Sequence, residues 1–306
     1  MKKIFILQLS IFWLLNAEVI TPIQQINEFD KTKVSLGKEL FFDKIFSKDN
    51  STSCASCHSD FGADKQTLSI GVEGKEGNIQ SLSVFNAVNN YKQFWNGRAA
   101  TLEEQIDGPV HNSAEMGVSE EGIEKKLNSS KNYIDKFHKA YGKKPSYKLF
   151  KDAIVEFEKT LVTPNSKFDQ YLKDETFLIP IEQKGFALFK NYGCAVCHNG
   201  VNIGGNSMQL IGNVIEYPYV EGQPDLYNIT KDEDDKNVFR VPSLRNISKT
   251  APYFHDGSML TLETAVIRMA YHNLGMVLDS AEAKAIVAFL KTLDGDIPTT
   301  WSEDVK

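Results

Sequence analysis

The 306-residue sequence has few cysteines, no basic run and no strand pattern that persists. Without a basic run, nucleic-acid binding is not expected, because it needs a clustered positive surface. The apolar run near the N-terminus, from Ile4 to Leu15, is shorter than the roughly 20 residues that a membrane-spanning helix needs. Apolar residues recur instead at helical spacing. The sequence therefore predicts an all-α fold, and its 42% of hydrophobic residues allow a sizeable core.

The first 17 residues have the pattern of a secretory signal. Two lysines, Lys2 and Lys3, precede the short apolar run, and the small residue Ala17 stands at its end. No cysteine follows the run, so a lipid-anchored lipoprotein is not expected. We expect residues 1–17 to be a signal peptide and the mature chain to begin at about Glu18 outside the cytoplasm. An uncleaved anchor is the alternative.

All four cysteines lie in two copies of one motif, C-x-x-C-H. The first copy is Cys54-Ala55-Ser56-Cys57-His58, and the second is Cys194-Ala195-Val196-Cys197-His198. This spacing is typical of covalent haem c, in which two thioethers hold the porphyrin and the histidine binds iron. A thioredoxin-like redox pair, a zinc site and disulfides are the alternatives, although a zinc ribbon would place its cysteine pairs much closer together. The sequence predicts two covalently bound haems.

Helices are expected on both sides of each motif. Amphipathic spacing, capping residues and breakers predict them at residues 31–47, 119–127, 146–161, 180–189, 261–272 and 280–293. A short helix-like stretch at 101–105 is expected to break at Asp107-Gly108-Pro109. Irregular loops are expected at 59–90 and 204–236. The order helix, motif, loop, helix occurs twice, which predicts two domains, 18–165 and 166–306.

Seven further segments surround the motifs in a fixed order. They are LGKELFFD (36–43), SIG (69–71), FWNGRA (94–99), LEEQ (102–105), the stretch from GP to EM (108–116), VPSLRN (241–246) and PYFHDG (252–257). With these segments the chain resembles the bacterial dihaem cytochrome c peroxidases and their MauG-like relatives. The resemblance implies two cytochrome-c-like helical domains. The N-terminal haem would react with peroxide, and the C-terminal haem would relay electrons.

The resemblance also assigns residues at the two haems. His58 would bind the first iron, and His198 with Met269 the second, because Ala265-Val266-Ile267-Arg268-Met269 matches the family's Ala-Val-x-x-Met. His272 and Met276 are competing ligands, and a core methionine is the other interpretation of Met269.

Catalytic roles follow from the same match. Glu115 matches the catalytic carboxylate and Gln105 the glutamine that holds peroxide or water. Taken alone, Glu115 would be an exposed carboxylate. His111 is expected to be an ordinary loop histidine.

Further residues are placed between the haems by the resemblance. Trp95 matches the electron-relay tryptophan. A calcium ion would be held by Gln80, where the family has asparagine, and by backbone oxygens near Thr250 and Pro252. Arg245 and His255 are expected to contact haem propionates or the region between the haems.

One residue departs from the pattern of many family members. Val72 stands where they carry a histidine that blocks the first iron until the other haem is reduced. The hypothesis is a first haem that is open even when fully oxidised.

The predicted function is that of a periplasmic peroxidase. It would reduce hydrogen peroxide to water with electrons from a small donor protein, a cytochrome c or a cupredoxin, passed from the C-terminal to the N-terminal haem. The net charge of −6 suits a basic donor. A homodimer is an assembly that the family often forms. The alternatives are a MauG-like oxidase that modifies a protein or organic substrate, and a dihaem electron carrier. MauG has a tyrosine where this chain has Met269, so the methionine favours the peroxidase.

Overall fold

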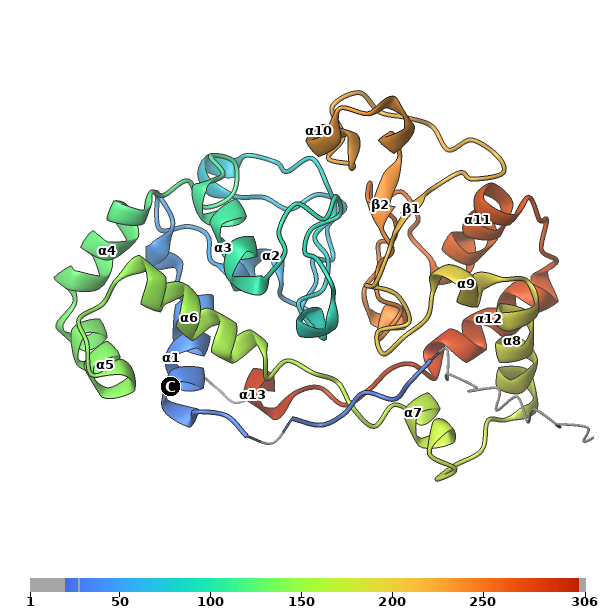
Figure 1. Ribbon diagram of the computed structural model, residues 1–306, viewed down its shortest axis with the longest axis horizontal. Coiled ribbons are helices and arrows are strands. Elements are labelled where there is room, and N and C mark those ends of the chain that lie inside the picture. The colour runs from blue at the N-terminus through green and yellow to red at the C-terminus, as the bar shows by residue number, and fades with distance from the viewer. Residues whose placement is uncertain (1–19, 27, 303–306) are drawn as a thin grey trace, which may run out of the picture.

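The computed structural model describes residues 20–26 and 28–302, which form two helical lobes side by side (Figure 1). The predicted signal peptide, 1–17, lies outside these residues. The elements are α1 (Lys31–Phe42), η1 (Lys44–Phe46), α2 (Cys54–Cys57), η2 (Val72–Gly74), η3 (Ala87–Asn89), α3 (Leu102–His111), α4 (Glu120–Ser129), α5 (Lys131–Tyr141), α6 (Tyr147–Glu158), α7 (Lys167–Leu172), α8 (Pro180–Asn191), α9 (Cys194–Cys197), β1 (Met208–Leu210), α10 (Tyr227–Thr230), η4 (Glu233–Asp235), β2 (Val238–Arg240), η5 (Ile247–Lys249), α11 (Leu262–Leu274), α12 (Ser280–Lys291) and α13 (Thr299–Ser302). No helix among the described residues is long and apolar enough to cross a membrane.

Each lobe is built on one close pair of helices. In the first lobe α1 packs on α6, and in the second α8 packs on α12. A Cβ atom at Gly37 would lie 1.8 Å from the backbone oxygen of Ala153, and one at Gly185 would lie 1.9 Å from that of Ala285. Only glycine lets the two backbones approach this closely. The same device in both lobes agrees with the internal duplication seen in the sequence.

Side chains that were expected to begin helices do so. Ser119, Ser146, Thr261 and Asp279 each accept a hydrogen bond from a backbone N–H in the first turn of the helix that follows. Pro180 occupies the first turn of α8, where its missing N–H costs nothing. The predicted all-α class is confirmed, with helix ends that differ from the predicted ones by a few residues.

Several local features differ from the expectation, and the helices α5 and α7 were not predicted. The break at Asp107-Gly108-Pro109 was wrong, because α3 continues through Pro109 to His111. Proline there removes a single hydrogen bond near the helix end. Gly108 is needed for packing, since a Cβ would lie 2.5 Å from Cζ of Phe94. A short antiparallel pair, β1 with β2, was also not predicted, because three-residue strands give too little alternation to recognise.

The ends of the described chain cross between the lobes (Figure 1). Ile20 is buried in the second lobe, with Phe168, Phe189 and Phe289. Trp301, at the other end, packs in the first lobe and stacks on Phe157 with ring centroids 6.4 Å apart. The N-terminal segment therefore packs on the second lobe and the C-terminal segment on the first. These contacts hold the two lobes together.

Candidate active site

The first C-x-x-C-H motif forms the short helix α2 and ends at His58. Nδ1 of His58 lies 3.1 Å from the backbone oxygen of Gly62. This contact orients the ring and leaves the other nitrogen, Nε2, for a metal. Burial lowers the pKa of His58, which favours the neutral imidazole that binds iron. The geometry of this histidine fits an axial ligand.

The second motif forms α9 and borders a largely apolar cavity of about 240 Å³. Cys194, Cys197 and His198 line it from one lobe, and Met269 of α11 lines it as well. Burial lowers the pKa of His198 to about 4, so this ring is also neutral. All four cysteines are free thiols, which removes the disulfide alternative. A predominantly apolar cavity with a few placed ligands fits a covalently held haem.

The competing ligands lie elsewhere. Nδ1 of His272 lies 3.0 Å from the backbone oxygen of Ile215, and the ring packs against Tyr217. Met276 packs against the core of the second lobe. Neither residue lines the cavity, so the structure places only Met269 of these three candidates beside the second motif.

Glu115 lies in the loop that follows α3 and folds back on the end of that helix. Its carboxylate accepts a hydrogen bond from Nδ2 of Asn112 at 2.6 Å. Burial raises the pKa of Glu115, although the Asn112 hydrogen bond and the charge of Arg98 oppose this effect. Burial also raises the pKa values of the Cys54 and Cys57 thiols, and the charge of Glu115 adds to the increase at both. The carboxylate therefore lies close to the first motif.

Arg98 is a neighbour of this carboxylate, and no role was predicted for it. Its guanidinium stacks 3.3 Å above the Phe94 ring, and its Nη1 donates to Oδ1 of Asn96. Gln105 lies three residues before Gly108 on α3, so it shares the helix face that meets Phe94 and Arg98. His111 ends α3, is exposed and packs against Tyr147, away from this group. Arg98 stands in the segment FWNGRA. Its role could not be predicted from this segment, because it depends on where the Phe94 ring lies in the fold.

Trp95 is buried between the lobes. Its Nε1 donates to the backbone oxygen of Gln80 at 2.8 Å, and its ring meets Phe239 and His255 edge-on. Trp95 also lines the cavity of the second motif. Leu82 lines the same cavity, and its backbone lies against His58 of the first motif. The indole is thus placed in the region that separates the two motifs.

Comparison with known proteins agrees with this geometry. The family model for di-haem cytochrome c peroxidase matches residues 31–176, and the cytochrome c model matches 182–294. The cytochrome c551 peroxidase of Nitrosomonas europaea is 43% identical over 285 residues, which cover 92% of this chain and 85% of that protein. The chain belongs to the di-haem cytochrome c peroxidase family.

Further relatives support this membership. The cytochrome c551 peroxidase of Pseudomonas aeruginosa is 41% identical, covering 86% of this chain and 79% of that protein. The crystal structure of a MauG-like protein associated with microbial copper homeostasis superposes with a TM-score of 0.81 at 28% identity, covering 95% of this chain and 98% of that one. The predicted family and the fold of two cytochrome-c-like domains are confirmed, and haem is the cofactor of this family member.

The residues predicted to hold calcium come together in this family member. Gln80, Thr250 and Pro252 all line the cavity that the second motif borders. The side-chain amide of Gln80 donates from Nε2 to the backbone oxygen of Asp64 at 3.4 Å, which leaves its oxygen available as a ligand. Among residues 20–26 and 28–302 no group of three or more histidine, cysteine or acidic side chains forms a metal cluster. Calcium binding stays a prediction.

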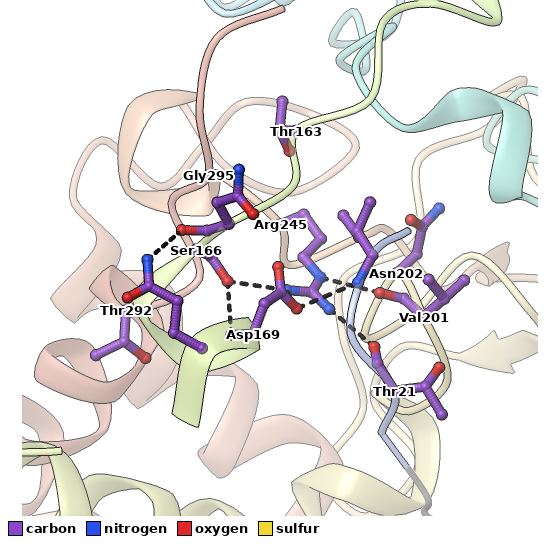
Figure 2. A network of polar contacts seen from close by, with 12 residues as sticks. Thr21, Thr163, Ser166, Asp169, Val201, Asn202, Arg245, Thr292 and Gly295 are labelled. Atoms are coloured by element: carbon purple, nitrogen blue, oxygen red, sulfur yellow. Dashed lines mark hydrogen bonds and ion pairs between the residues drawn. The ribbon is translucent and has the colours of Figure 1, made fainter. Parts of the chain in front are cut away.

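Arg245 is held by a network of protein groups (Figure 2). Its side chain is fully buried and pairs with Asp169, with 2.7 Å between Nη1 and Oδ1. It also donates to Ser166 and to the backbone oxygens of Val201 and Thr21. The guanidinium thus ties the N-terminal segment to the second lobe. Arg245 also lines the cavity that the second motif borders, and its contact with a propionate stays a prediction. The His255 ring stacks on Phe239 with ring centroids 4.2 Å apart, and its predicted contact with the haem region stays a prediction.

Proposed function

We propose that this protein is a periplasmic dihaem c-type peroxidase that reduces hydrogen peroxide to water. The first lobe would hold a haem through Cys54, Cys57 and His58. The second lobe would hold a haem through Cys194 and Cys197, with His198 and Met269 as the side chains that would bind its iron. The domains would be residues 18–165 and 166–306, exported by the signal peptide. The observation that carries the proposal is the half-buried Glu115 beside Arg98 and the first motif.

Glu115 is the group that moves the proton. When bound, haem supplies the iron chemistry that breaks the O–O bond of peroxide. The Glu115 carboxylate accepts a proton from one peroxide oxygen and returns it to the other, which leaves as water. Arg98 lies close enough to affect the pKa of Glu115 and supplies positive charge where negative charge develops. Gln105 hydrogen-bonds peroxide or water on the same side. Two electrons and two protons convert one peroxide to two water molecules.

Electrons would enter at the second lobe and leave through Trp95 to the first. The position of this indole between the motifs supports the direction, as does Met269, because a methionine ligand raises the potential of haem iron. A small donor, a cytochrome c or a cupredoxin, would dock at the second lobe, and a basic donor suits the net charge of −6. Calcium at Gln80, Thr250 and Pro252 and a homodimer complete the proposal.

Val72 explains why no prior reduction would be needed. It is fully buried, and its backbone N–H donates to the backbone oxygen of Glu115 at 2.9 Å. Val72 therefore packs against the loop that carries Glu115. Its side chain has no atom that could bind iron, unlike the histidine that many family members carry at this position. Together with the exposed side of Glu115, this arrangement supports a first haem that is open to peroxide in the oxidised enzyme.

Electron paramagnetic resonance of the fully oxidised protein, before and after peroxide, tests the proposal. We expect one high-spin and one low-spin signal, with the high-spin signal lost on adding peroxide. Stopped-flow oxidation of a reduced small cytochrome should then consume two donor electrons for each peroxide. Two low-spin signals indifferent to peroxide would contradict the open site. Peroxide consumption without donor oxidation, coupled to modification of another protein, would identify the MauG-like alternative.

A further inference from the structure

Arg240 is a buried cation at the boundary of the two lobes. It ends β2 and is 3% exposed. Its backbone N–H donates to the oxygen of Trp95 at 2.6 Å, and its Nε donates to the oxygen of Phe94 at 3.1 Å. Both contacts cross from the second lobe to the first. The position of the guanidinium is therefore fixed relative to the relay tryptophan.

The end of this guanidinium has no protein partner. Nη1 is buried and donates to no acceptor among residues 20–26 and 28–302, and no ion pair involves Arg240 there. Burial lowers its pKa to about 10, and the only opposing charge is that of the Tyr91 phenol. Arg245 is equally buried but pairs with Asp169. Burying a charged group without a partner is strongly unfavourable. We therefore expect an anion to pair with the Arg240 guanidinium.

The anion has to reach Arg240 from the cavity. Arg240 lines the cavity that Cys197, His198 and Met269 also line. A haem held there carries two propionate carboxylates, and a planar guanidinium is the side chain best suited to bind a carboxylate. Protein carboxylates do not fill this role, because none pairs with Arg240 in the described part of the chain.

We propose that Arg240 binds a propionate of the haem attached at Cys194 and Cys197. The inference rests on the haem attachment in the proposed function. Arg245, five positions later, lines the same cavity, but its guanidinium already pairs with Asp169 and donates to backbone oxygens. Because Arg240 is hydrogen-bonded to the backbone of Phe94 and Trp95, it is a positioning residue: it fixes one edge of the haem against the segment that carries the relay. Its charge also favours the reduced haem by neutralising the propionate.

Redox titration of the purified holoprotein tests this role without an activity assay. Arg240→Met removes the charge and keeps much of the volume, Arg240→Lys keeps the charge, and Arg268→Met removes an exposed arginine of α11 as the matched control. In Arg240→Met we expect the reduction equilibrium of the methionine-ligated haem to shift at least tenfold toward the oxidised form, about 59 mV for one electron. Arg240→Lys should shift it less, and Arg268→Met should leave it unchanged.

Three results would overturn the inference. One is an unchanged potential in Arg240→Met with both haems present, which means that water or a small anion neutralises the arginine. Another is a shift confined to the other haem. The third is loss of haem from both Arg240→Met and Arg240→Lys, which indicates a packing role rather than charge. If only Arg240→Met loses that haem, the charge requirement is supported. A wild-type protein with fewer than two haems in the pyridine haemochrome assay would refute the proposed function itself.

Discussion

Replacing Glu115 by glutamine separates its chemical role from its structural one. Glutamine has the same shape, and its Oε1 can still accept the hydrogen bond from Asn112. It cannot accept and return a proton at neutral pH. The substitution should therefore leave the loop after α3 in place and remove only the proton transfer that we propose for this carboxylate.

The expected loss is large. A positioned general acid–base contributes about 10²–10⁴-fold to a rate, or about 3–5 kcal/mol of barrier, and Glu115→Gln should lose an amount in that range. Because burial raises the pKa of Glu115, the wild-type rate should rise with pH as this carboxyl deprotonates above the ordinary value of 4.5. That limb of the pH profile should vanish in Glu115→Gln.

Glu115→Gln should lower the reaction rate without lowering the folding stability. A carboxyl group whose pKa is raised on folding binds its proton more tightly in the folded state, so stability falls as pH rises through its unfolded value toward its folded one. Glutamine removes this loss, and Glu115→Gln should be at least as stable as the wild type at pH 7. Urea denaturation measures this difference.

Stopped-flow mixing of the oxidised enzyme with peroxide measures the first step directly. Glu103→Gln, at an exposed position on α3, is the matched control and should react at the wild-type rate. The argument is refuted if Glu115→Gln reacts within threefold of the wild type with both haems present. A rate that falls together with haem content or stability would equally contradict a purely chemical role.

Four further changes test other parts of the structure. Trp95→Phe removes the indole between the motifs and should slow electron arrival at the first haem with both haems retained; an unchanged steady-state rate argues against the relay. Met269→Ala should lower the midpoint potential of the second haem in a redox titration. Asp169→Asn leaves the fully buried Arg245 without its counterion and should cost about 3–5 kcal/mol of unfolding free energy in denaturant titrations, whereas no change would mean that Ser166 suffices. Burial raises the pKa of Glu158 to about 8, so the wild type should lose stability between pH 4.5 and 8, by up to roughly 5 kcal/mol at 1.36 kcal/mol per unit, and Glu158→Gln should flatten that dependence in urea melts at several pH values.

Much of the fold follows from local sequence. Caps such as Ser119 and Asp279 act within one helical turn, so their effect can be predicted without tertiary structure. The haem motifs are equally local, because the cofactor itself sets the spacing of the cysteines and the histidine. Where only local contacts decide, the predictions agree with the structure.

The site is less predictable where distant segments meet. Gly108 and Pro109 look like a helix break, yet α3 continues because Phe94 packs against the glycine. Arg240 and Arg245 are both arginines in one short segment, and nothing local shows which of them meets a protein carboxylate. Both arginines line the cavity, and Asp169, far away in sequence, pairs with Arg245 and not with Arg240. The burial of Glu158 was not predicted, because it results from the way α6 packs in the folded chain.

The contacts across the boundary explain how two duplicated lobes can work as one enzyme. Backbone hydrogen bonds join Arg240 to Trp95 at 2.6 Å, Gln80 to His255 at 2.8 Å and Tyr91 to Gly205 at 2.9 Å. Backbone atoms cannot change rotamer, so the backbone of Trp95 keeps its position relative to both motifs. The terminal segments pack through Ile20 and Trp301 against the cores of opposite lobes, and these contacts also resist separation of the lobes. A fixed boundary is what electron transfer between two haems requires, because the distance between them has to stay the same while peroxide and water enter and leave.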